Sequence, residues 1–161
     1  MEISPPFILQ AIANWDPVVF VRDSKYGMPV VQSLHLMGLT LFLATTVTLD
    51  LRLAGLGMKE LPLVVLARQL KPWARAALTM LIVSGVCIFL PTPGKYLGSN
   101  PFRIKMAMLS LAIVFHFAVL RRILRFEPAS RPRFLNLIIA CVSLTLWFSV
   151  GWAGRAIAFV P

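Results

Sequence analysis

Acidic side chains are scarce in this 161-residue chain, which holds six Asp and Glu residues against sixteen Lys and Arg residues. Cysteine and histidine are rarer still, with two of each. No pair of carboxylates is placed for acid–base chemistry, and no P-loop, nucleophile elbow or Cys-x-x-Cys motif occurs. The sequence therefore predicts no catalytic residues, and hydrolysis or group transfer is a poor interpretation of this chain.

Charge is missing altogether from four mostly apolar stretches. They are Tyr26–Leu49, Ala76–Gly94, Met106–Leu120 and Phe134–Gly154. Hydrophobic residues make up 58% of the chain and the mean hydropathy is +0.81, well above the values of a soluble domain. Since about 20 apolar residues cross the ~30 Å hydrocarbon core, the pattern predicts an all-α membrane protein, an up-down bundle of four transmembrane helices. We place the spans at about 28–50, 75–92, 103–121 and 134–153.

Much of the net charge of +10 lies in two basic clusters, one after the first span and one before the fourth. The positive-inside rule assigns such clusters to the cytoplasm. We therefore expect a multi-pass protein of the bacterial inner (cytoplasmic) membrane with both termini periplasmic. Nucleic acid is not an expected partner. The clusters comprise Arg52, Lys59, Arg68, Lys71 and Arg75, followed by Arg121, Arg122, Arg125, Arg131 and Arg133.

Two shorter segments have the pattern of amphipathic helices that lie on the membrane surface. Near the N-terminus, Ser4 is a suitable cap and Ile8, Ile12 and Trp15 share one face. Residues 1–25 are thus predicted to form a periplasmic interfacial segment, and residues 26–155 a single four-helix transmembrane domain. A second interfacial helix, on the cytoplasmic surface, is predicted over Glu60–Trp73, where large apolar residues recur at helical spacing.

Polar residues inside the spans are informative because each costs free energy in lipid unless it is paired or functional. At 100° per residue they fall on stripes that we expect to face the bundle interior. Interhelical hydrogen bonding is the structural interpretation of these stripes. A functional interpretation is a binding site inside the bundle. The stripes are Gln32, His35, Leu39, Phe42, Thr46 and Asp50; then Lys105, Leu109, Ala112 and His116; then Asn136, Ser143 and Trp147.

The two histidines are candidate axial ligands of a b-type haem, because imidazoles on facing helices of a bundle bind iron. His35 is about 9 Å inside the outer end of its span, and His116 about 20 Å, at 1.5 Å per residue. This offset of ~10 Å argues against both histidines binding one iron. His35 is closer in depth to Met106 and Met108, which leaves a His/Met haem or a copper site open.

Gln32 and Lys105 are predicted to share the outer half of the bundle with His35. Lys105 lies four or five residues into the third span, where a long side chain can snorkel to the membrane surface. Its ammonium group is also suited to hold an anion, such as a haem propionate or a lipid phosphate. The two cysteines, Cys87 and Cys141, are expected on separate spans at different depths, as small packing residues rather than a disulfide.

Three strings in the chain resemble an uncharacterised bacterial family of four-helix inner-membrane proteins. They are His35–Leu56, Leu70–Trp73 and Tyr96–Met106. The most specific piece is Asn100-Pro101-Phe102 followed by Lys105 at the start of the third span. More remotely, a histidine near the start of a span followed by small residues is similar to CopD-like copper-resistance proteins and cytochrome b-type membrane proteins. The chain departs from the di-haem cytochrome pattern, since it lacks two depth-matched histidine pairs.

These resemblances imply redox or copper work on the periplasmic side. The leading hypothesis is an accessory or anchor subunit of a periplasm-facing redox complex, with a haem b or quinone pocket that includes Gln32, His35, His116 and Lys105. A copper-handling protein that uses His35, Met106 and Met108 is the alternative, and a purely structural subunit is a third. The expected partners are the lipid bilayer, other membrane subunits or further copies of the chain, and a periplasmic redox protein.

Overall fold

The computed structural model describes residues 6–58, 60–125 and 132–157. Within these ranges the chain forms seven α-helices and no strand. The helices are α1 (Phe7–Ala13), α2 (Asp16–Asp23), α3 (Gly27–Leu53), α4 (Leu63–Phe89), α5 (Pro93–Leu97), α6 (Asn100–Arg125) and α7 (Arg133–Ala156).

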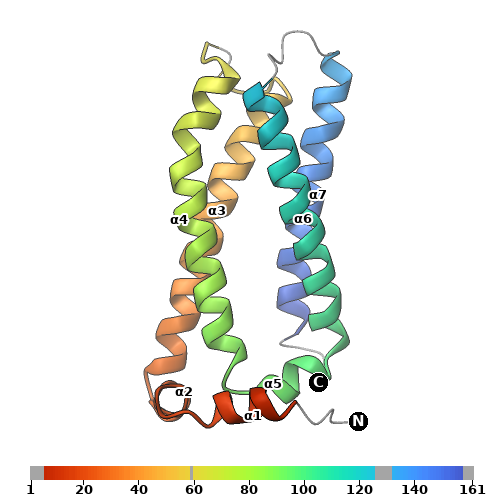
Figure 1. Ribbon diagram of the computed structural model, residues 1–161. Coiled ribbons are helices and arrows are strands. Elements are labelled where there is room, and N and C mark those ends of the chain that lie inside the picture. Colours follow the sequence, from red (N-terminus) through yellow and green to blue (C-terminus); the bar gives the residue numbers. More distant parts are fainter. Residues whose placement is uncertain (1–5, 59, 126–131, 158–161) are drawn as a thin grey trace.

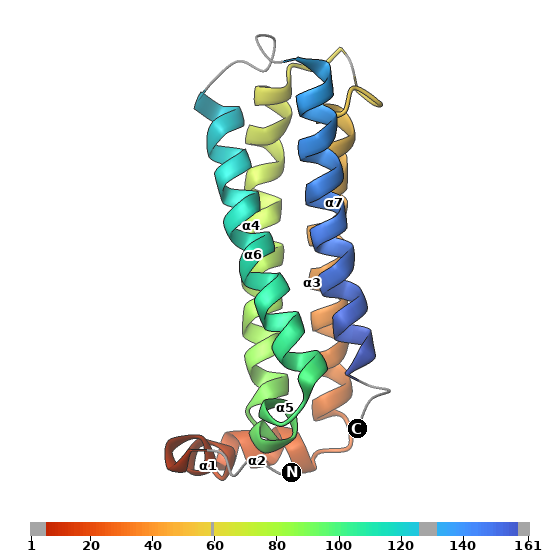
Figure 2. The same cartoon turned by 90° about the vertical axis from the view of Figure 1, so that its right-hand side faces the viewer.

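The four long helices α3, α4, α6 and α7 stand side by side and alternate in direction (Figures 1 and 2). Each is long and apolar enough to cross a membrane, with 24 to 27 residues in the apolar helical stretch. The short helices α1, α2 and α5 all lie at one end of the bundle, which we call the terminal end. The opposite end, where α3 gives way to α4 and α6 to α7, is called the basic end. The predicted all-α architecture with four candidate transmembrane helices is confirmed.

The helices pack as two close pairs, α3 with α4 and α6 with α7. Gly38 shows why α3 and α4 come so near: a Cβ atom placed there would lie 3.3 Å from the Ala77 carbonyl oxygen and from Leu81. Small residues at such crossings let helix backbones approach, which is the usual basis of packing between membrane helices. The pairs then join mainly through α3 and α7, and α4 meets α6 less closely.

The bundle interior holds two apolar clusters. The one at the basic end is built from Leu49, Leu53, Ala67, Ile123 and others, and Ile123 is fully buried. The central cluster contains residues of all four long helices: Phe42, Ala77, Ala112, Trp147 and Val150. Phe42 is 1% exposed, and its ring meets that of Trp147 edge-on with centroids 4.5 Å apart. Phe42 is therefore the packing centre of the middle of the bundle.

The predicted interfacial helix over Glu60–Trp73 is not a separate element. Residues 63–73 form the first part of α4, which continues to Phe89 through Pro72. A proline inside a helix removes one backbone hydrogen bond and costs stability. Here Leu63, Leu66 and Ala67 are buried in the bundle, with Leu63 and Ala67 in the basic-end cluster, so packing offsets that cost. The apolar face at residues 63–70 was recognised correctly, but its partner is the protein core.

The predicted N-terminal interfacial segment contains two helices, α1 and α2, with a break at Asn14-Trp15. The proposed cap Ser4 lies outside the described residues. Ile8, Trp15 and Phe20 are 70%, 64% and 74% exposed, so these large apolar side chains have no cover from the protein itself. Apolar residues in this position suit a segment that lies at a membrane surface.

Candidate functional site

The interior stripes predicted from helical periodicity do face the bundle interior. Thr46, Asp50, Ser143 and Trp147 are all at most 4% exposed. On α6, Ala112 is fully buried, His116 is 9% exposed, and Lys105 and Leu109 are half-buried. Gln32 is the exception, because it is exposed near the start of α3. The stripes therefore identify the interior surfaces, and burial is incomplete at Gln32 and Lys105 near the terminal end and at Asn136 near the basic end.

His35 is fixed by a hydrogen-bond chain that runs into α4. The His35 Nδ1 and Ser84 Oγ atoms lie 2.9 Å apart, and the Ser84 hydroxyl donates to the Met80 carbonyl oxygen of its own helix. Since that hydroxyl has only one proton, the oxygen accepts from His35, and Nδ1 must carry the ring proton. The neutral ring therefore keeps its lone pair on Nε2. This is the arrangement that orients a ligating histidine, with one nitrogen anchored and the other available.

Small residues and one cation surround the His35 ring. Gly85 packs against it, since a Cβ atom there would lie 3.5 Å from His35 Cε1. Lys105 of α6 is near enough to interact electrostatically with His35. The Lys105 side chain in turn lies over Gly154 of α7, within 3.4 Å of where a Cβ would be. We call His35, Ser84, Gly85, Lys105 and Gly154 the His35 site.

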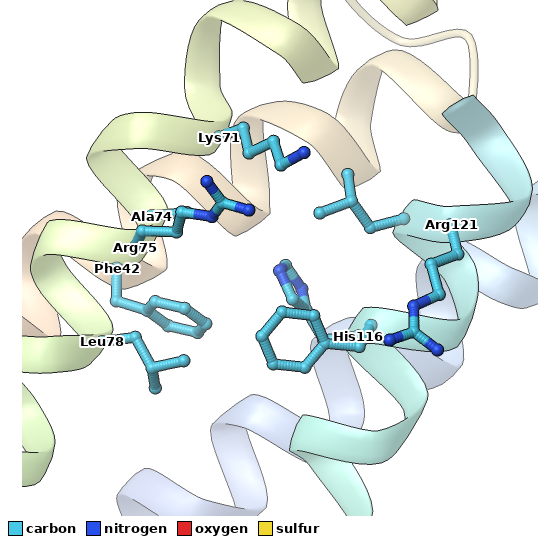
Figure 3. A pocket seen from close by; sticks show the side chains of 9 residues that line it. Phe42, Lys71, Ala74, Arg75, Leu78, His116 and Arg121 are labelled. Atoms are coloured by element: carbon cyan, nitrogen blue, oxygen red, sulfur yellow. The ribbon is translucent and has the colours of Figure 1, made fainter. Parts of the chain in front are cut away.

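His116 has a different environment, formed by aromatic rings. Its ring centroid lies 5.5 Å from that of Phe42, 5.8 Å from Phe117 and 6.1 Å from Trp147. Phe42 is seven residues beyond His35 on α3, which is about 10 Å along a helix. The two histidines thus occupy separate levels of the bundle, as the depth estimate from the sequence indicates. His116 also lines a cavity of about 180 Å³ between α4 and α6 (Figure 3).

A buried carboxylate lies nearer the basic end. Asp50 is 3% exposed, and the Ser143 hydroxyl of α7 donates a hydrogen bond to it. Its Oδ2 atom has no hydrogen-bond partner in the described part of the chain. Arg52, its neighbour in sequence, instead donates to the Leu61 carbonyl oxygen at 2.9 and 2.7 Å. Asp50 and Ser143 therefore form a polar contact between α3 and α7.

The predicted methionine ligands both lie on α6. Met106 is 43% exposed on α6, and Met108 packs against the central cluster around Phe42. Cys87 and Cys141 are both free thiols. Among the described residues, no group of three or more His, Cys, Asp and Glu side chains is close enough to hold a metal ion. The copper hypothesis at His35, Met106 and Met108 stays a prediction.

Sequence reasoning missed three members of the His35 site: Ser84, Gly85 and Gly154. Each is small and lies in an apolar stretch, so none of them alters the hydropathy pattern. The one available signal was the Ser84-Gly85 pair in the second span, because small and hydroxyl residues mark contacts between membrane helices.

Comparison with known proteins identifies a family. Residues 23–160 match the model of a Family of unknown function (DUF6644), and the chain belongs to this family. The match covers the four long helices and begins at the last residue of α2. No curated protein matches the chain, and no solved structure does.

Proposed function

We propose that this protein is an accessory or anchor subunit of a membrane redox complex and that it binds haem b or a quinone head group at the His35 site. The observation that carries the proposal is the hydrogen-bond chain from His35 through Ser84 to the Met80 carbonyl. In this chain the Nδ1–H group donates a hydrogen bond to the Ser84 oxygen. The Nε2 atom of the half-buried imidazole is then a hydrogen-bond acceptor held in a fixed direction.

The residues present fit either cofactor. A neutral imidazole with an anchored Nδ1–H is a suitable axial ligand for haem iron, and the same Nε2 is a suitable acceptor for a quinol hydroxyl. Lys105 supplies a positive charge near the ring, suited to a haem propionate or a quinone oxygen. When bound, either group supplies the electron-transfer chemistry. The protein's part is to orient His35, hold the charge of Lys105 close and keep the site in an apolar surrounding.

Ser84 has the role of a positioning residue. Its hydroxyl ties the ring of α3 to the backbone of α4, so the two most closely packed helices hold His35 from both sides. Gly85, one residue on, presents no side chain to the ring and lets the backbone of α4 pack against it. Partners that orient a ligating histidine are typically worth 10- to 100-fold in affinity.

Orientation follows from the charge pattern. The described residues of both basic clusters belong to the end opposite α1, α2 and α5, so the positive-inside rule favours a cytoplasmic basic end and periplasmic termini in a bacterial inner membrane. His35 lies on the half of α3 nearer the terminal end, and the site would then face the periplasm. Many large apolar residues on the outside of the long helices are exposed, as expected for contact with lipid or with other membrane subunits.

The test is to purify the protein in mild detergent from cells replete in haem and quinone, together with His35→Ala and His116→Ala. Oxidised and dithionite-reduced absorption spectra report haem b, and solvent extraction followed by chromatography reports quinone. We expect one of the two in wild type and in His116→Ala, and its loss in His35→Ala. If all three proteins are colourless and free of quinone, the proposal fails and the purely structural subunit is favoured. Metal analysis of the same samples tests the copper alternative.

A further inference from the structure

The cavity at His116 has features that the proposed cofactor site does not use. It opens between α4 and α6, the neighbouring helices that pack least closely, in the half of the bundle toward the basic end. Its volume is about 180 Å³. A water molecule in the liquid takes roughly 30 Å³, so the space suits a phosphate group with a few further atoms.

Three cationic side chains line this cavity: Lys71 and Arg75 from α4, and Arg121 from α6. Figure 3 shows the ends of Lys71 and Arg75 extending toward the space in which the His116 ring lies, with Arg121 on the opposite wall. No Asp or Glu is among the described residues that line it. The opening of the cavity is therefore strongly positive.

None of these three cations has a protein partner within the described ranges, where no hydrogen bond or ion pair involves Lys71, Arg75 or Arg121. Lys71 and Arg75 are also one helical turn apart, a spacing at which like charges destabilise a helix. The His116 ring makes aromatic contacts, and its nitrogens have no hydrogen-bond partner in this part of the chain. Three cations and an imidazole thus surround one cavity, and none of the described protein groups there accepts hydrogen bonds from them. This indicates that a bound anion is the missing acceptor.

We propose that this cavity binds a phosphate group, the chemistry shared by anionic phospholipid head groups and small phosphate compounds. Arg75 and Arg121 would approach it from facing helices, and guanidinium groups match phosphate oxygens in paired hydrogen bonds. The surroundings favour a lipid as the source. Leu78, Phe117 and Leu120 form the apolar part of the wall, as the glycerol and first acyl carbons of a phospholipid require. Basic pockets between membrane helices on the cytoplasmic side suit such head groups.

The experiment uses the full-length protein in detergent and two double variants. Arg75→Gln with Arg121→Gln removes two cations from the cavity. Arg68→Gln with Arg122→Gln removes the same charge from the same two helices at residues that do not line it. Native mass spectrometry counts bound phosphatidylglycerol after stepwise delipidation, with phosphatidylcholine as the neutral comparison lipid. A parallel arm adds inorganic phosphate and measures the shift of the thermal unfolding midpoint.

We expect phosphatidylglycerol to bind wild type and the Arg68/Arg122 variant at least tenfold more tightly than the Arg75/Arg121 variant. If millimolar inorganic phosphate alone stabilises wild type with the same dependence on Arg75 and Arg121, the source is a small phosphate compound rather than a lipid. Equal loss in both double variants would show diffuse attraction to a basic surface and would overturn the proposal. Absence of binding in wild type, or equal binding of phosphatidylcholine, would overturn it as well. Circular dichroism of both variants checks that the helices remain folded.

Discussion

The two histidines of this chain occupy the same bundle and have opposite surroundings. His35 lies among small residues, and the hydrogen bond to Ser84 fixes which nitrogen holds the proton. His116 lies among the rings of Phe42, Phe117 and Trp147, with three cations around the cavity beside it. The neighbours rather than the residue type decide what an imidazole is suited for. We propose the first as a ligand or acceptor, and the second as part of a pocket for an anion.

The largest effect on the surroundings of His116 is expected from removing the aromatic ring of Phe42, which packs against it. Phe42→Ala deletes the most buried aromatic side chain of the central cluster, and such deletions cost about 3–5 kcal/mol of unfolding free energy. We expect the largest loss of stability of any single change proposed here, measured by titration with sodium dodecyl sulfate. Phe148→Ala is the control, because Phe148 is 65% exposed on α7 and its removal leaves no cavity. Similar losses in both variants would contradict the assignment of Phe42 as the packing centre.

Ser84→Ala tests the hydrogen bond that orients the other histidine, His35. It removes the acceptor for His35 Nδ1–H and lets the ring rotate, while the bulk of the side chain hardly changes. We expect the affinity of the His35 site for the proposed haem b or quinone to fall by about 10- to 100-fold, measured by cofactor retention or titration.

Ser110→Ala is the matched control for Ser84→Ala. Ser110 also donates to the carbonyl four residues before it, at 2.9 Å, but it lies exposed on α6 and contacts no histidine. Its replacement should leave cofactor affinity unchanged. Equal effects of the two serine variants would mean that Ser84 acts on the helix rather than on His35.

Lys105→Gln should have a smaller effect than Phe42→Ala or Ser84→Ala. Its charge is half-buried near the terminal end, where partial exposure limits an ionic interaction to about 1 kcal/mol or less. Cofactor binding should weaken by up to about fivefold, and more so at low than at high ionic strength. Lys95→Gln, in the exposed α5 position at the same end, is the control with the same charge change. An unchanged affinity in Lys105→Gln would assign this side chain to snorkelling alone.

Hydropathy and helical periodicity were enough to predict most of the architecture. Four spans, their alternating directions and the interior faces at Phe42, Asp50, His116 and Trp147 follow from residue spacing, because in lipid a polar stripe has to face other helices. The separation of the two histidine levels likewise follows from counting residues at 1.5 Å each. These features are local to one helix, which is why one sequence suffices to predict them.

What the sequence did not reveal depends on which helices become neighbours. Ser84 and Gly85 matter only because α4 packs against the His35 face of α3, and the pair by itself does not indicate which helix it contacts. The meeting of Lys71 and Arg75 with Arg121 requires α4 to lie beside α6. The prediction of a separate helix over residues 60–73 was wrong because its amphipathic pattern was interpreted as that of a surface element. Burial of Leu63 and Leu66 in the bundle decided otherwise.

The central claim is that His35 acts through its free Nε2 atom, and chemical rescue tests it most directly. In His35→Gly, the missing ring leaves room for free imidazole beside Ser84 and Gly85. We predict that the variant purifies without cofactor, and that millimolar imidazole during reconstitution with haem b or quinone restores the wild-type spectrum or quinone content. His116→Gly should retain its cofactor without imidazole. If His35→Gly is folded and stays empty in imidazole, or if it binds as wild type does without it, His35 is not the ligand.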